Sequence, residues 1–344
     1  MFSHPLARPG GLGSSPLAGR SRWRGWAAAL LLIASGCDSA GDTRPTPESL
    51  AAGRIVVVAE DREEPLWSSL RELAKTGPRR RRPVEILVDA PALPSATAQQ
   101  ELLRKLTSPQ PSALCLIPTE LDALRGQLDA LVRDGLPVIL IGRDLPETRR
   151  TAYCGPVEYE IGQAAARAAV TLAAHGSRTV ILAHAGADDP MYGERYAGFV
   201  RELRLFRDVT LLREVGCGRT RGDALTLIRS EAHRYPRAGC WVLLGDWPFR
   251  ALPDSERLLS PDDRIVLCHI GFKYLPRLRR TDLAALVTAD LARAAEQAVS
   301  LAIQWTAPQA VPEQTVITVP VEVVTPENLP EFERRLSAAS RPAS

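Results

Sequence analysis

Short apolar runs alternate with stretches of helical periodicity along most of this chain. Runs of four or five residues rich in valine, isoleucine and leucine are typical of strands buried on both faces of a parallel sheet. In the first half of the chain, strands are expected at 55–59, 84–88, 113–117 and 137–141, with helices at 96–107 and 119–134. This alternation predicts an α/β fold in which helices connect successive parallel strands.

The same alternation begins again after residue 150. An alanine-rich helix is expected at 158–175, followed by strands at 179–183, 209–212, 240–244 and 265–270 and by helices at 190–204 and 221–234. Two consecutive units of this kind predict two doubly wound parallel-sheet lobes joined by a hinge. Because ligands of open α/β sheets bind beyond the carboxyl ends of the strands, facing lobes would form a cleft that closes on a ligand.

Length and charge exclude several classes of function. The 344 residues are enough for two domains with cores of their own. The net charge is +3, and four arginines with no acidic residue stand in residues 1–36, so a nucleic-acid partner is not expected. The basic run of Lys75 and Arg79–Arg82 is interpreted as a solvated loop. The sequence shows no phosphate loop, dinucleotide fingerprint or nucleophile elbow, so we expect no cofactor and no enzymatic activity.

The cysteines beyond residue 50 are five in number: Cys115, Cys154, Cys217, Cys240 and Cys268. Their odd number and wide spacing indicate neither a zinc site nor a disulfide framework. Cys115 and Cys268 stand in apolar runs and are expected to be buried thiols. A pairing of Cys217 with Cys240 is left open.

Residues 1–36 are organised as a secretory signal peptide. Arg20, Arg22 and Arg24 stand just before the apolar run Trp26–Ala34, which is too short to span a bilayer, and Ser35 and Gly36 stand before Cys37. Small residues before a cysteine resemble the bacterial lipobox, whose cysteine is lipidated and becomes the new N-terminus. The alternatives are an uncleaved anchor and an ordinary cleaved signal.

The lipobox resemblance implies a periplasmic or otherwise extracytoplasmic protein that is attached to the membrane only through its N-terminal lipid. Asp38 after the cysteine indicates retention at the inner membrane. Residues 37–52 are expected to be a flexible tether.

Five segments beyond residue 52 carry short motifs whose order along the chain matches that of a known family. They are Pro137–Arg143, Gly155–Gly162, Arg178–Gly186 with Glu194–Phe199, Val266–Phe272 and Val316–Val323. Together they resemble the type I periplasmic binding proteins, the ribose- and galactose-type solute receptors of ABC importers, whose core is shared with lactose-repressor-type regulators. The resemblance implies an N-terminal lobe of residues 53–150 plus about 275–300. It implies a C-terminal lobe of residues 151–272 plus about 301–328, and a tail of residues 329–344.

The resemblance also implies a ligand site in the cleft. The residues at or next to the family's ligand positions are Glu64, Trp67, Arg143, Asp144, Arg195, Asp246, Trp247, Lys273 and Asp290. An aromatic ring such as Trp67 can stack on a sugar, while charged groups bind its hydroxyls. Gly142 and Lys273 stand where aspartates are usual. If Lys273 faces the cleft with Arg143 and Arg195, an anionic sugar is favoured; alternatively, Lys273 pairs with Glu64, Asp144 or Asp246.

The function implied is that of an extracytoplasmic solute-binding lipoprotein that closes on a small, polar, carbohydrate-like ligand and passes it to an ABC permease. One alternative is a ligand sensor that is read by a membrane kinase or a chemoreceptor. Another is a degenerate binding fold that serves a protein partner, in which Trp67, Trp247 and Phe249 pack on one another and fill the cleft.

Overall fold

The computed structural model describes most of the chain beyond residue 52. The described residues are 53–62, 70–71, 74, 84–107, 110–174, 176–186, 189, 192–218, 221–307 and 314–339. The expected signal peptide, Cys37, Asp38 and the tether lie outside these residues, as do Glu64, Trp67, Lys75 and Arg79–Arg82.

The first lobe is built on a parallel sheet of six strands. They are β1 (Gly53–Val58), β2 (Val84–Asp89), β3 (Ala113–Leu116), β4 (Val138–Ile141), β5 (Ala152–Gly155) and β11 (Thr315–Thr318). Their order is β11-β5-β4-β3-β1-β2, and every pairing is parallel. All four residues of β3 and of β4 are buried, as their continuous apolar runs predict.

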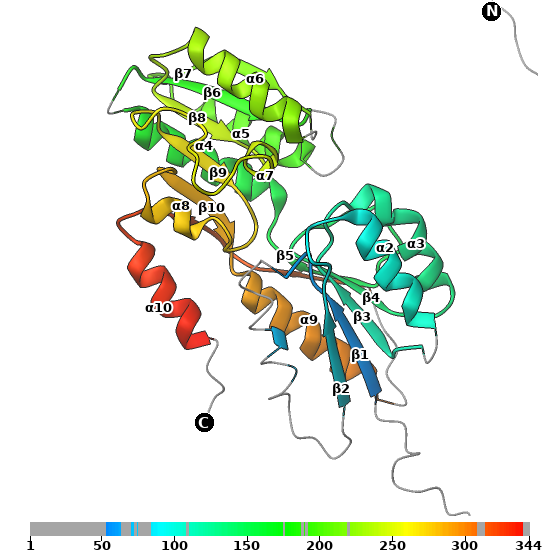
Figure 1. Ribbon diagram of the computed structural model, residues 1–344. Coiled ribbons are helices and arrows are strands. Elements are labelled where there is room, and N and C mark those ends of the chain that lie inside the picture. Colours follow the sequence, from blue (N-terminus) through cyan, green and yellow to red (C-terminus); the bar gives the residue numbers. More distant parts are fainter. Residues whose placement is uncertain are drawn as a thin grey trace, which may run out of the picture. The chain divides into compact units, whose positions relative to one another are not determined.

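Helices lie along both faces of this sheet (Figure 1). They are α2 (Ala96–Arg104), which continues into the 3-10 turn η2 (Lys105–Thr107), α3 (Leu121–Arg133) and α9 (Leu291–Trp305). The hydroxyl of Ser95 caps α2 by accepting a hydrogen bond from the backbone nitrogen of Ala98 at 3.3 Å. Helix α9 comes from far along the chain and packs against β1, β3, β4, β5 and β11.

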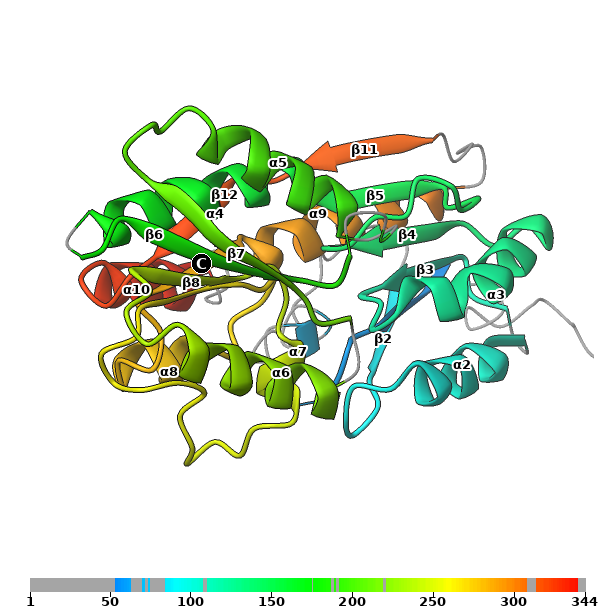
Figure 2. The same ribbon diagram turned by 90° about the horizontal axis from the view of Figure 1, so that it is seen from above.

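The second lobe also contains a six-stranded sheet. Its strands are β6 (Thr179–His184), β7 (Thr210–Gly216), β8 (Cys240–Leu243), β9 (Ile265–Cys268), β10 (Ala285–Ala289) and β12 (Val321–Val324), in the order β12-β10-β9-β8-β6-β7. All pairings are parallel except that of β12 with β10. The helices are α4 (Glu158–Ala173), α5 (Gly193–Leu203), α6 (Arg221–Arg234), α7 (Trp247–Arg250), α8 (Leu275–Arg279) and α10 (Leu329–Ala339) (Figure 2). The predicted fold of two doubly wound lobes is therefore confirmed.

Three strands belong to a different sheet from the one expected. Strand β5 lies in the first sheet, although the second lobe was expected to begin at 151, and β10 lies in the second sheet, although 275–300 was expected in the first lobe. The expected late strand at 316–323 is two strands, with β11 in the first sheet and β12 in the second. The apolar pattern of a strand predicts its burial, but long-range pairing decides which sheet it joins.

The expected tail is also partly corrected, because α10 occupies Leu329–Ala339. Its Phe332 is buried against Phe272 of the second lobe, with 5.9 Å between the ring centroids. In the described part of the chain, no helix is both long enough and apolar enough to cross a membrane.

Candidate functional site

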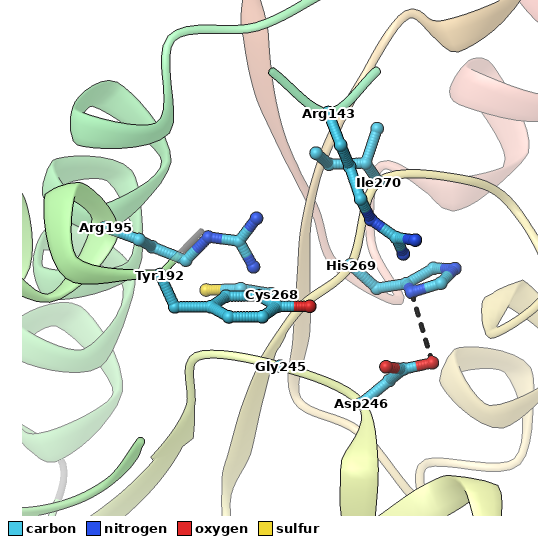
Figure 3. A pocket seen from close by; sticks show the side chains of 8 residues that line it. All are labelled: Arg143, Tyr192, Arg195, Gly245, Asp246, Cys268, His269 and Ile270. Carbon is cyan, nitrogen blue, oxygen red and sulfur yellow. Dashed lines mark ion pairs between the residues drawn. The ribbon is translucent and has the colours of Figure 1, made fainter. Parts of the chain in front are cut away.

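A small polar pocket lies where strands of the two sheets end. Arg143 follows β4 of the first lobe, and seven residues of the second lobe complete the lining: Tyr192, Arg195, Gly245, Asp246, Cys268, His269 and Ile270 (Figure 3). In this structure the lining side chains lie so close together that no space the size of a water molecule remains between them. The position beyond the carboxyl ends of parallel strands is the one at which open α/β sheets bind ligands.

Arg143 is the first lobe's contribution to the lining. Its side chain is held in the wall by Nη1, which donates to the carbonyl oxygen of Pro118 at 2.8 Å and to Oε1 of Glu60 at 3.2 Å. The residue is 6% exposed. Burial alone would lower the pKa of Arg143, but the carboxylate of Glu60 raises it above its usual range. The guanidinium therefore keeps its charge.

Arg195 enters the pocket from helix α5 of the second lobe. Its Nε donates to Oε2 of Glu158 on α4 at 2.7 Å, and its Nη1 donates to the carbonyl oxygen of Leu244 at 2.6 Å. The guanidinium lies 5.0 Å from the ring centroid of Tyr192, within cation–π range. Burial would lower the pKa of Arg195, but the charge of Glu158 raises it.

Asp246 follows β8 and is fully surrounded by donors. Its Oδ1 accepts from Nε of Arg250 at 2.9 Å, and its Oδ2 accepts from the hydroxyl of Tyr274 at 3.0 Å. His269 Nδ1 lies 3.5 Å from Oδ2. Burial alone would raise the pKa of Asp246, but the charges of Arg250 and His269 and the hydrogen bond from Arg250 hold it well below its usual range.

Four predicted ligand residues are described but are not part of the lining. Asp144 accepts from Nη2 of Arg150 at 2.7 Å, and Asp290 caps α9 by accepting from the backbone nitrogen of Arg293 at 2.9 Å. The Nζ atom of Lys273 lies 5.5 Å from the ring centroid of Tyr274. These roles are local, because each side chain finds its partner on its own loop or helix.

Trp247, the fourth of these residues, is 2% exposed. It packs edge-on against the ring of Tyr192, with 4.9 Å between the centroids. Phe249 packs on Tyr274 instead, at 5.5 Å. Trp247 and Phe249 therefore pack on tyrosines and not on each other, and Trp67, the third residue of the expected aromatic cluster, lies outside the described residues.

The pocket does not bring together the three basic residues that were expected to face it, Arg143, Arg195 and Lys273. Among the described residues, Arg143 and Arg195 line it and Lys273 does not. Each arginine faces a carboxylate, Glu60 for Arg143 and Glu158 for Arg195. Of the alternative partners proposed for Lys273, Asp144 is bound by Arg150 and Asp246 by Arg250, whereas Glu64 lies outside the described residues. Two arginines and one carboxylate line the pocket, and the charges balance once Glu60, Glu158 and Arg250 around it are counted.

The sequence did not single out Tyr192 or His269 for this pocket, nor Glu60 and Arg250 behind it. Glu60 and His269 each stand one or two residues after a strand, a signal that could have identified them. Among the residues that the structure describes, no group of three or more His, Cys, Asp or Glu side chains could hold a metal ion. The five described cysteines are buried and free, Cys217 and Cys240 included.

Two doubly wound lobes whose strand ends meet around a buried polar pocket define a two-lobed ligand-binding protein. A family model described as "Periplasmic binding protein domain" matches residues 55–304. The chain therefore belongs to the periplasmic binding proteins.

Solved structures share this fold at low sequence identity. A periplasmic ribose ABC transporter protein from Conexibacter woesei is 19% identical, with a TM-score of 0.64 over 85% of this chain and 98% of that chain. A Caulobacter myo-inositol binding protein, bound to myo-inositol, is 21% identical, with a TM-score of 0.61 over 83% and 97%. A chain of the XylFII–LytSN complex is 17% identical, with a TM-score of 0.57 over 80% and 99%. No curated protein matches the sequence.

Proposed function

We propose that this protein is an extracytoplasmic solute-binding protein that closes on a small, polar, carbohydrate-like ligand and carries out no bond-making chemistry. The observation that carries the proposal is the pair of buried arginines, Arg143 and Arg195, that enter one pocket from opposite lobes. A ligand that binds both arginines makes its full set of contacts only when the lobes are closed. Differential affinity for the closed state then drives closure.

The arrangement of the two arginines suits hydroxyl groups. A guanidinium has five N–H donors, and the contacts of Arg143 with protein oxygens in the described residues are all made by Nη1. Its remaining N–H groups are available to a ligand. The ring of Tyr192 adds an apolar face next to Arg195.

The charge balance favours a ligand without net charge. Around the pocket, the three arginines Arg143, Arg195 and Arg250 face the three carboxylates of Glu60, Glu158 and Asp246. An anion would have to displace one of these carboxylates from its partner. A neutral sugar or polyol needs only the donors and acceptors left over, as the ribose-type and inositol-binding relatives of the fold suggest.

The test is a thermal-shift screen against neutral sugars, polyols, sugar acids and sugar phosphates. A ligand at about 100 times its Kd adds about 2.7 kcal/mol to stability, which raises Tm by several degrees at roughly 2–4 °C per kcal/mol. The shift should vanish in Arg143→Gln and in Arg195→Gln. Arg201→Gln, an exposed change on the same helix as Arg195, should retain it.

Two other outcomes would change the proposal. A hit confined to acidic sugars would contradict the neutral ligand while keeping the receptor. No shift with any compound, from a protein that melts cooperatively, would favour a fold that serves a protein partner.

We further propose delivery of the ligand to an ABC permease and attachment to the membrane through a lipid on Cys37. The leader sequence supports the anchor, and the family supports the transport role. A sensor role is the second candidate, because a chain of this fold occurs in a complex of XylFII with LytSN.

A further inference from the structure

The side chain of Arg250 contacts carboxylates of both lobes. Arg250 ends helix α7 in the second lobe, and its Nε donates to Oδ1 of Asp246 at 2.9 Å. Its Nη2 lies 3.8 Å from Oε1 of Glu60, which follows β1 of the first lobe. The side chains of Arg250 and Glu60 are only 8% and 11% exposed. We call Glu60, Arg250 and Asp246 the Arg250 bridge.

The bridge is connected to the wall of the pocket at both ends. In the first lobe, Oε1 of Glu60 also accepts from Nη1 of Arg143, a lining residue. In the second lobe, Asp246 is itself a lining residue and also accepts from Tyr274. A continuous row of charges therefore runs from one wall to the other, through Arg143, Glu60, Arg250 and Asp246.

The physical setting makes this row strong. Charges this well buried are screened little by salt, and removing one partner leaves the other without compensation. Burial would lower the pKa of Arg250, but Asp246 and Glu60 raise it above its usual range. Asp246 stays ionised because its pKa is held low. Arg250 and Asp246 thus stay charged throughout the physiological pH range.

The pocket beside the Arg250 bridge is narrow. The side chains of the pocket leave no space large enough for a water molecule, whereas ordinary ligand sites have roughly 300–1,000 Å³. A sugar-sized ligand can enter only if the lobes separate, and separation must break the contact between Arg250 and Glu60. The contact therefore competes with the step that admits the ligand.

We propose that Arg250 is a built-in clamp between the lobes: its guanidinium, held by Asp246, binds Glu60 and favours the closed arrangement before any ligand arrives. This inference deepens the proposed function and rests on it for its biological meaning. If the clamp holds the lobes together, the rate of ligand association is limited by the separation of the lobes. Glu60 and Arg250, which do not line the pocket, then set that rate.

The experiment measures the distance between the two lobes in the ligand-free protein. Spin labels on Leu93→Cys in the first lobe and Leu205→Cys in the second, both exposed positions, report this distance by double electron–electron resonance, with Cys37→Ser to remove that thiol. The five described native cysteines are buried, and their raised pKa values make them poor targets for the label.

In the Arg250→Ala background, we expect a shift to longer distances, by about tenfold in the ratio of open to closed molecules. Millimolar methylguanidinium chloride should restore the short distance by occupying the place of the lost side chain, whereas the same concentration of sodium chloride should not. Arg229→Ala removes an exposed ion pair with Glu256 within the second lobe and should leave the distance unchanged.

A double-mutant cycle separates the clamp from general damage to the fold. Arg250→Gln and Glu60→Gln should each lengthen the distance, and the double variant should add little to either. Additive effects, or an unchanged distance in Arg250→Ala, would overturn the inference. The distance measurement needs no ligand, so a ligand screen without hits would not affect its result. Conversely, an unchanged distance in the variants would overturn the clamp but not the proposal that the protein binds a ligand.

Discussion

Charged side chains at the strand ends illustrate how much a single position can and cannot predict. The resemblance of their segments to the binding-protein family implied Arg143 and Arg195 as ligand residues, and both line the pocket. Their partners Glu60 and Glu158 lie 83 and 37 residues away in the sequence. The sequence around an arginine carries no information about carboxylates so far away in the chain. These carboxylates nevertheless decide whether the arginine is free to attract an anion.

His184, at the end of β6, provides a test of burial at the residue scale. Its Nε2 lies 3.8 Å from Oε2 of Glu214, and its ring packs on Tyr196 with 4.9 Å between the centroids. Burial lowers the pKa of His184 below its usual value, and Glu214 opposes this shift without cancelling it. Below about pH 6.5, the unfolded chain therefore takes up a proton that the folded protein resists.

We expect stability to fall as the pH drops below about 6.5, and to fall less in His184→Gln. Urea denaturation at several values between pH 7.5 and 5 measures the difference. Glu214→Gln removes the opposing charge, so the loss on acidification should become larger. Parallel pH profiles for the wild type and His184→Gln would refute the assignment.

At the scale of elements, the packing of α4 on α5 positions the second lobe's arginine. A Cβ added at Gly162 of α4 would lie 1.9 Å from the carbonyl oxygen of Arg195, and one at Gly198 of α5 would lie 2.1 Å from that of Tyr159. The two helix backbones are therefore in direct contact. This contact brings Glu158 to Arg195 and holds the guanidinium at the pocket.

Gly162→Ala should force these helices apart. We expect a loss of about 1–3 kcal/mol in the free energy of unfolding, the usual effect of overpacking, together with weaker ligand binding because Arg195 moves. Gly126→Ala on the exposed face of α3, where no atom lies within 4 Å of the added Cβ, should instead stabilise by up to about 1 kcal/mol. Equal urea midpoints for the two variants would contradict this account.

At the scale of the whole molecule, the chain passes between the two lobes at three points. The crossings follow β5, follow β10 and separate β11 from β12. The first lobe is consequently completed by α9 and β11, which come after the second lobe in the sequence. Seven side chains of α9 are buried, among them Leu291, Val299 and Ile303.

A fragment of residues 53–157 should therefore fail to fold. It lacks α9 and β11, so one face and one edge of its sheet would be exposed to water. Thermal unfolding followed by circular dichroism should show no cooperative transition for the fragment, and a transition should return when residues 290–319 are joined to it by a flexible linker. A cooperative melt of the fragment alone would show that the lobes are independent.

The α/β class and the two lobes could be predicted from the sequence, because burial of a short apolar run and the periodicity of a helix are local properties. Arg143 and Arg195 could be predicted because their segments resemble those of a known family. The sheet to which β5, β10 and β11 belong could not, since strands of similar composition compete for the same neighbours. Tertiary structure also decided that Lys273 is not part of the lining and that Arg250 contacts both lobes. Contacts of this kind join residues far apart in the chain, and their strength comes from burial that exists only after the lobes have formed.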